Sequence, residues 1–145
     1  MATRLGKMPV WQKYFVISSI GLCSITGLIF LLVTDFQLPI FFFRPHTILS
    51  WHGITAMAAS IALGSVLTVH LKAGLKAKRQ LFSGLSQLAC LLILILTAAL
   101  LYYGPAELRE DAIRAHWVIG IIFFSFFLSH SIHASVNKKP SVEGF

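Results

Sequence analysis

The sequence predicts an all-α fold, in which four transmembrane helices form a bundle with both the N and C termini in the cytoplasm. Of the 145 residues, 57% are hydrophobic and only 12% are charged, whereas about half of a soluble domain is apolar and about a quarter is charged. The apolar residues are gathered in four long runs, and most basic residues flank one end of these runs. We therefore expect residues 1–145 to form a single integral membrane domain.

Each run has about 20 residues or more, which is the length that a helix needs to cross the hydrocarbon core. In chain order, the predicted helices span residues 14–33, 46–70, 81–103 and 115–134. The first is longer than the apolar core of a signal peptide, which has roughly 7–15 residues, and we interpret it as a retained helix. The loop between the second and third helices is short and basic, so these helices are expected to be antiparallel neighbours. Gly104–Pro105 ends the third helix and begins an outer loop.

The distribution of charge predicts the topology. Most of the 12 Lys and Arg residues lie before the first helix, between the second and third, or after the fourth. These residues are Arg4, Lys7, Lys13, Lys72, Lys76, Lys78, Arg79, Lys138 and Lys139. Because cytoplasmic loops are enriched in Lys and Arg, both termini are expected inside, in a protein of the bacterial inner (plasma) membrane. The net charge of +7 thus indicates topology, and no nucleic-acid partner is expected.

All the histidines lie on the second and fourth predicted helices or at their ends. They are His46, His52, His70, His116, His130 and His133. A helix turns by about 100° per residue, so His52 and His70, which are 18 residues apart, point the same way. His116 and His130 are 14 residues apart, so their directions differ by about 40° around the helix axis. The two helices run parallel, so they can present one histidine pair near the outer surface and another near the inner surface.

Two imidazoles that converge from facing helices are what a six-coordinate haem b needs, since the neutral ring nitrogen is a good axial ligand to iron. We expect two non-covalent haems b, one bound by His52 and His116 and the other by His70 and His130. Haem propionates need cations near the membrane surface. Arg44 and Arg114 are the outer candidates for this role, and Lys72 or Lys138 are the inner ones. Cys23 and Cys90 are isolated and form no Cys-x-x-Cys-His motif, so covalent haem attachment is not expected.

This pattern, H-x13-H on one transmembrane helix facing two histidines on another, resembles the di-haem cytochromes b. The size and the four-helix plan are most similar to the membrane cytochrome b subunits of respiratory formate dehydrogenases and nickel–iron hydrogenases. They also resemble a group of short bacterial proteins with histidine-bearing helices. The resemblance covers residues 46–133 and implies two haems b stacked across the membrane, with electron exchange to a quinone. In the formate dehydrogenase and hydrogenase type, ligands also come from the first helix, which has no histidine here.

The spacing leaves the ligand set open. At about 1.5 Å per residue, 18 residues rise roughly 27 Å and 14 residues roughly 21 Å, although both pairs must serve the same two irons. His133 in place of His130 gives a rise of roughly 26 Å from His116, but it lies about 100° away from His116 around the helix. His46 and His133 are therefore possible substitute ligands, or residues of a proton path to a quinone.

The predicted function is that of a b-type di-haem membrane electron carrier, which passes electrons across the bilayer between a quinone pool and a redox partner. The sequence has no nucleotide-binding G-x-G-x-x-G motif after a strand. We therefore expect an electron-transfer subunit of an oxidoreductase that works with other subunits or a soluble redox protein, not a stand-alone catalyst. Two alternatives remain, namely a histidine-lined proton or metal transporter and a non-redox anchoring subunit of a membrane complex. The predicted helices contain no Asp or Glu, which disfavours the transporter.

Overall fold

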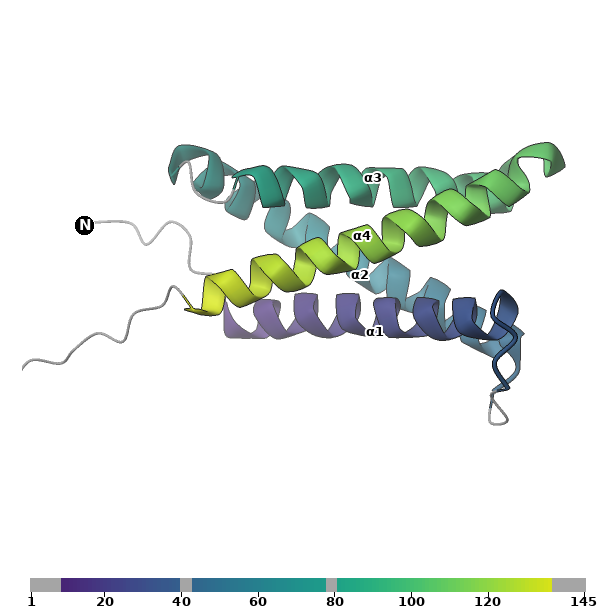
Figure 1. Cartoon of the computed structure of the whole chain (residues 1–145). Helices are drawn as coiled ribbons and strands as arrows, with labels where there is room; N and C mark the ends of the chain where they lie inside the picture. Colours follow the sequence, from purple (N-terminus) through teal and green to yellow (C-terminus); the bar gives the residue numbers. More distant parts are fainter. Residues whose placement is uncertain (1–8, 40–42, 78–80, 137–145) are drawn as a thin grey trace, which may run out of the picture. The chain divides into compact units, whose positions relative to one another are not determined.

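The protein, as a computed structural model, is described over residues 9–39, 43–77 and 81–136, and over the side chains of these ranges except 68–77, 81, 83 and 133–136. These ranges hold α1 (Val10–Thr34), α2 (Pro45–Ala77), α3 (Leu81–Tyr103), the short 3-10 helix η1 (Ala106–Leu108) and α4 (Arg109–Val136), and no strand (Figure 1). All four α-helices are long and apolar enough to cross a membrane. This confirms the predicted all-α fold with four membrane-length helices.

Two of the helices continue well beyond the apolar runs in the sequence. α2 extends past His70 to Ala77, through a stretch of Ala and Lys residues that favour helix. α4 begins at Arg109, before its apolar run, and has Glu110 and Asp111 in its first turn. Negative charges near a helix N-terminus are stabilised by the helix dipole. Helix propensity and the helix dipole therefore favour helix at the polar ends of α2 and α4. Hydropathy measures neither effect.

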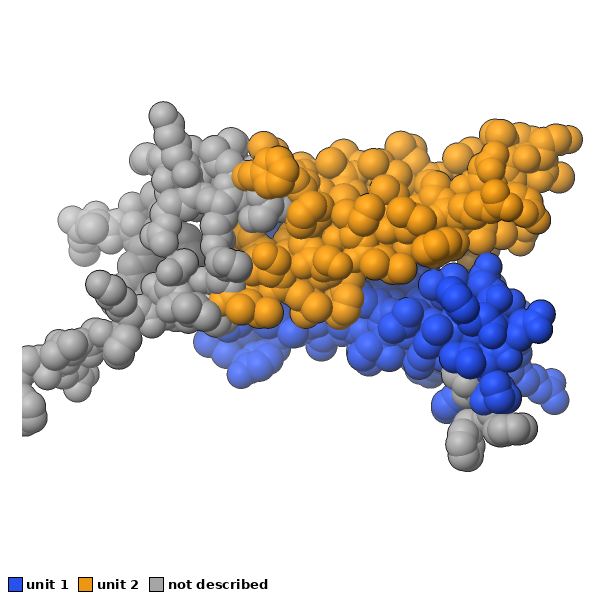
Figure 2. Space-filling model, in the orientation of Figure 1, with its two compact units in different colours: residues 1–79 blue, residues 80–145 orange. Residues whose placement is uncertain are grey.

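The chain divides into two compact units, residues 1–79 and residues 80–145 (Figure 2). Unit 1 contains α1 and α2, and unit 2 contains α3 and α4. In each unit the two helices pack as an antiparallel pair, joined by side-chain hydrogen bonds. Each unit is described by itself below.

In unit 1, the facing surfaces of α1 and α2 are stripes of residues spaced three or four apart. The amide Nε2 of Gln12 donates to Ser65 Oγ over 3.0 Å near one end, and the Oγ1 atoms of Thr26 and Thr55 lie 3.4 Å apart near the other. Between these links, the α2 stripe contains Ala59 and Ala62, both buried. Small residues of this kind let helix backbones approach closely in a membrane.

In unit 2, α3 and α4 pack in the same way but with larger side chains on α4. The amide Nε2 of Gln87 donates to the backbone carbonyl of Phe126 over 3.1 Å. Leu94 packs against Gly120, where a Cβ would lie 3.9 Å from Leu94 Cδ2, an ordinary contact. The α4 stripe comprises His116, Gly120, Phe123, Phe127 and His130, again at intervals of three or four.

The start of α2 and the end of α3 each have a defined backbone geometry. At the start of α2, the carbonyl of Arg44 accepts hydrogen bonds from the backbone N–H groups of Thr47 and Ile48, and Pro45 occupies the first helical position, where its missing N–H costs nothing. At the end of α3, Gly104 turns so sharply that a Cβ there would lie 2.5 Å from the carbonyl oxygen of Leu100.

The outward surfaces of the helices are apolar. On α2, Ile54, Met57 and Ile61 share one face and are 58%, 69% and 65% exposed. On α3, Leu92 and Leu96 are more than half exposed. Such surfaces suit helices whose solvent is lipid, because a helix satisfies its own backbone hydrogen bonds and needs only apolar side chains outside.

Candidate functional site

His52 is held on the α1 side of α2 by a backbone carbonyl. Its Nδ1 atom lies 3.0 Å from the carbonyl oxygen of Cys23. A carbonyl oxygen only accepts hydrogen bonds, so Nδ1 must carry the hydrogen. In the neutral imidazole the lone pair is then on Nε2, and this is one of the two ring nitrogens through which histidine binds metals.

The rest of the His52 environment favours the same tautomer. Thr26 Oγ1 lies 3.4 Å from Nδ1, but its hydroxyl donates to the carbonyl of Leu22 over 2.8 Å. A hydroxyl has one hydrogen, so its oxygen faces Nδ1 as an acceptor. The thiol Sγ of Cys23 lies 3.8 Å from Nδ1. The Nδ1 edge of the ring is thus surrounded by groups that can accept its hydrogen.

Gly27 provides the surface on which the His52 ring rests. A Cβ at this position would lie 2.8 Å from Cε1 and 3.1 Å from Nδ1 of His52. Real Cβ atoms do not approach other atoms to 2.8 Å, so the ring packs directly against the α1 backbone. Glycine is required here because of this close approach.

His116 is held in unit 2 by a side chain of α3. Its Nδ1 atom lies 2.8 Å from Oγ1 of Thr97, which is buried. The Thr97 hydroxyl donates to the carbonyl of Ile93 over 2.9 Å. When its only hydrogen is used in that bond, the Thr97 oxygen accepts from Nδ1–H of His116. In that arrangement His116 has the same tautomer as His52.

His52 and His116 share one arrangement. Each lies on a histidine-bearing helix, and each hydrogen-bonds through Nδ1 to the neighbouring helix, which has no histidine. Metal-ligating histidines commonly donate their other ring N–H to a carbonyl or a side chain, which fixes the ring orientation and raises the basicity of the ligating nitrogen. The surroundings of His52 and His116 are thus of the kind that a metal-ligating histidine has.

The structure describes the other candidate ligands only in part. His130 is half-buried on α4, on the same stripe as His116. His70 and His133 lie within α2 and α4, but their side chains are outside the described residues, as are the Lys72 side chain and all of Lys138. The pairing of His52 with His116 and of His70 with His130 joins residues of different units, and it stays a prediction. His46 is exposed in the first turn of α2.

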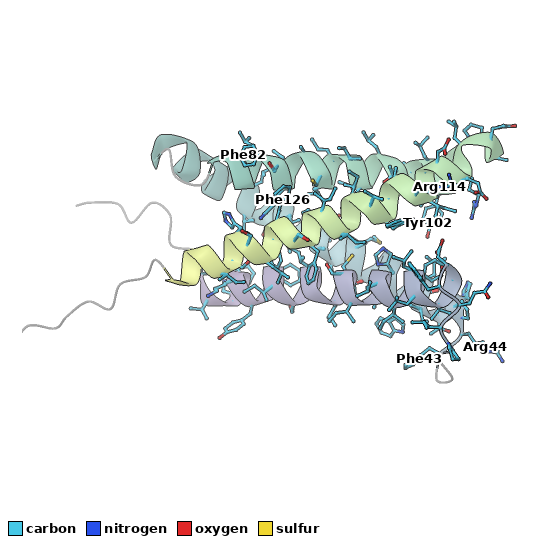
Figure 3. All side chains as sticks on the ribbon, viewed as in Figure 1. Phe43, Arg44, Phe82, Tyr102, Arg114 and Phe126 are labelled. Atoms are coloured by element: carbon cyan, nitrogen blue, oxygen red, sulfur yellow. The ribbon has the colours of Figure 1, made fainter. Side chains whose placement is uncertain are left out.

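The two arginines predicted to bind propionates at the outer surface are both exposed. Arg44 directly precedes α2, and Arg114 lies in the second turn of α4 (Figure 3). Arg114 forms an exposed ion pair with Glu110, with 3.6 Å between Nη2 and Oε2. An exposed pair of this kind contributes little to stability, about 0–1 kcal/mol. The role of both arginines in binding propionates stays a prediction.

Within the described residues, no three His, Cys, Asp or Glu side chains gather as a metal-binding group. Comparison with known proteins finds no matching family model, no matching curated protein and no matching solved structure. The likeness to cytochromes b therefore stays a prediction from the histidine pattern.

Sequence reasoning missed the residues that hold His52 and His116. Any residue has a backbone carbonyl, so the sequence has no signal for the acceptor at Cys23. Gly27 and Thr97 are ordinary residues of apolar helices when read alone. Their role follows from the register of the antiparallel helix pair. In the α3–α4 register, Thr97 lies opposite His116 and Gln87 lies opposite Phe126.

Proposed function

We propose that this chain is a b-type di-haem membrane electron carrier, which passes electrons across the bilayer between a quinone pool and a redox partner. The observation that carries this proposal is the shared arrangement of His52 and His116. Nδ1 of His52 lies 3.0 Å from the carbonyl oxygen of Cys23, and Nδ1 of His116 lies 2.8 Å from Thr97 Oγ1, each on the adjacent helix. This arrangement supports the proposal because metal-ligating histidines commonly hydrogen-bond through their other ring nitrogen in this way.

In this proposal the chain's residues bind and orient the cofactor. His52 and His116 supply the ligating Nε2 atoms for an outer haem b, and His70 and His130 supply them for an inner one. A haem bound there would supply a one-electron redox centre. The surrounding apolar side chains exclude water, and Arg44 and Arg114 lie at the outer surface as partners for propionates.

The setting of the proposed function is the bacterial inner membrane, with both termini in the cytoplasm because the basic residues cluster on that side. The chain would act as a subunit or partner, receiving or delivering electrons through another protein, and through a quinone near the inner end. His46 and His133 would serve as proton-path residues or substitute ligands.

The proposal is tested by potentiometric titration of the haem absorption bands in the full-length protein purified in detergent. Wild-type protein is expected to show two redox waves. His52→Ala and His116→Ala are each expected to lose the same wave, because both residues would bind one haem, and the remaining wave is expected to persist. Met57→Ala is the control, since Met57 lies on α2 and is 69% exposed, and it should keep both waves. If the two ligand variants lost different waves, the assigned pairing would be wrong.

A further inference from the structure

We infer that Thr97 is a positioning residue for the outer haem, and that its hydroxyl controls the orientation and basicity of His116. The inference rests on the proposed function, since His116 acts there as an axial ligand. Thr97 would not touch the haem itself. It would act through the hydrogen bond between its Oγ1 and Nδ1 of His116, which spans 2.8 Å.

The geometry of Thr97 suits this role. Its side chain is 7% exposed, and its β-branched form restricts rotation about χ1. The hydroxyl is anchored in its own helix by donating to the Ile93 carbonyl over 2.9 Å, with the Leu94 carbonyl 3.1 Å away. The oxygen is thus a fixed acceptor at one point of α3. A fixed acceptor holds the imidazole of His116 in one orientation.

The two outer histidines differ in how their acceptor can be changed. The acceptor for His52 is the backbone carbonyl of Cys23, which no side-chain replacement removes. The acceptor for His116 is a hydroxyl on a side chain, which a single substitution removes. A hydrogen bond from Nδ1–H makes Nε2 a stronger electron donor, and a stronger donor stabilises the more positive state of a metal. Loss of this bond should therefore raise the midpoint potential of the outer haem.

The substitution Thr97→Val tests this inference, because valine has nearly the shape of threonine but has no acceptor. In purified full-length protein, we expect the affinity for the outer haem to fall by about 10–100-fold. The midpoint potential of that haem should rise, and its low-temperature EPR signal should shift. The inner haem should keep its potential and its signal. Thr97→Ser, which retains the hydroxyl, should restore the wild-type values.

The outcomes separate the inference from the proposed function. A wild-type protein without haem would overturn the proposed function. A wild-type protein with two haems, together with an unchanged potential and EPR signal in Thr97→Val, would overturn only the inference. Equal changes at both haems, or no restoration by serine, would indicate general damage to packing and would also overturn it. If the valine variant does not fold, as judged by circular dichroism, Thr97→Ala is used in its place. Alanine also removes the hydroxyl and has a smaller side chain.

Discussion

At Gly27, the backbone of α1 lies directly against the imidazole of His52, with no room for a methyl group. The nearest ring atoms are those of the Cε1–Nδ1 edge, the edge that hydrogen-bonds to the Cys23 carbonyl. Any side chain at position 27 must therefore push the ring away from its acceptor. Gly27 therefore allows the His52 ring to reach its acceptor.

We predict that Gly27→Ala will displace His52 and reduce the occupancy of the outer haem. Overpacking of this kind costs about 1–3 kcal/mol, because either the ring or the helix must move. Gly21→Ala is the matched control, since it lies on the same helix and nothing lies within 4 Å of the Cβ it would add. A pyridine haemochrome assay of both variants measures the effect. Equal haem content in the two variants would contradict the role given to Gly27.

The sequence identified the histidines of the candidate site but not what holds them. His52 and His116 could be singled out because ionisable residues are rare in apolar helices. The Cys23 carbonyl and the Thr97 hydroxyl could not, because their role depends on the register between two helices. That register is set by long-range contacts, such as the hydrogen bond from Gln12 to Ser65, that composition and periodicity do not reveal.

At the scale of the helices, both units have a polar link at each end of their helix pair. Near one end, a glutamine of the first helix bonds to the second: Gln12 to Ser65 in unit 1, and Gln87 to Phe126 in unit 2. Toward the other end, a threonine of the first helix lies beside the histidine of the second. The two helix pairs are thus built alike.

The first helix pair is one turn longer between these links. Gln12 and Thr26 are 14 residues apart, whereas Gln87 and Thr97 are 10 apart. The histidine spacings differ by the same amount, 18 residues against 14, and four residues are about one helical turn. The difference between the histidine spacings on α2 and α4 is therefore matched by the difference between the Gln–Thr spacings on α1 and α3. Both helices of a pair share it.

This correspondence favours His130 over His133 as the counterpart of His70. Ser65 is five residues before His70 and Phe126 is four before His130, whereas Phe126 is seven before His133. We predict that His130→Ala will remove the inner haem, and that His133→Ala will retain two haems per chain. The measurement is the haem count and redox titration of each variant. Loss of a haem in His133→Ala alone would reverse the assignment.

At the scale of the whole molecule, the fold class was predictable because it is encoded locally. A helix that crosses lipid must satisfy its own backbone and be apolar for about 20 residues, and a run such as residues 81–103 meets both conditions without reference to the rest of the chain. The polar ends of α2 and α4 were not predicted, because hydropathy does not detect helix that lies beyond the hydrocarbon. The pairing of His52 with His116 depends on contacts between distant parts of the chain, so sequence spacing can only suggest it.

The central claim is that this chain binds two haems b. The most direct test is a reduced-minus-oxidised visible spectrum of the full-length protein purified in detergent, with a pyridine haemochrome count per chain. We predict sharp b-type bands and two haems per chain. A colourless protein would contradict the claim, and bound zinc in that protein would favour the transporter in its place. One haem per chain would contradict the arrangement of two histidine pairs.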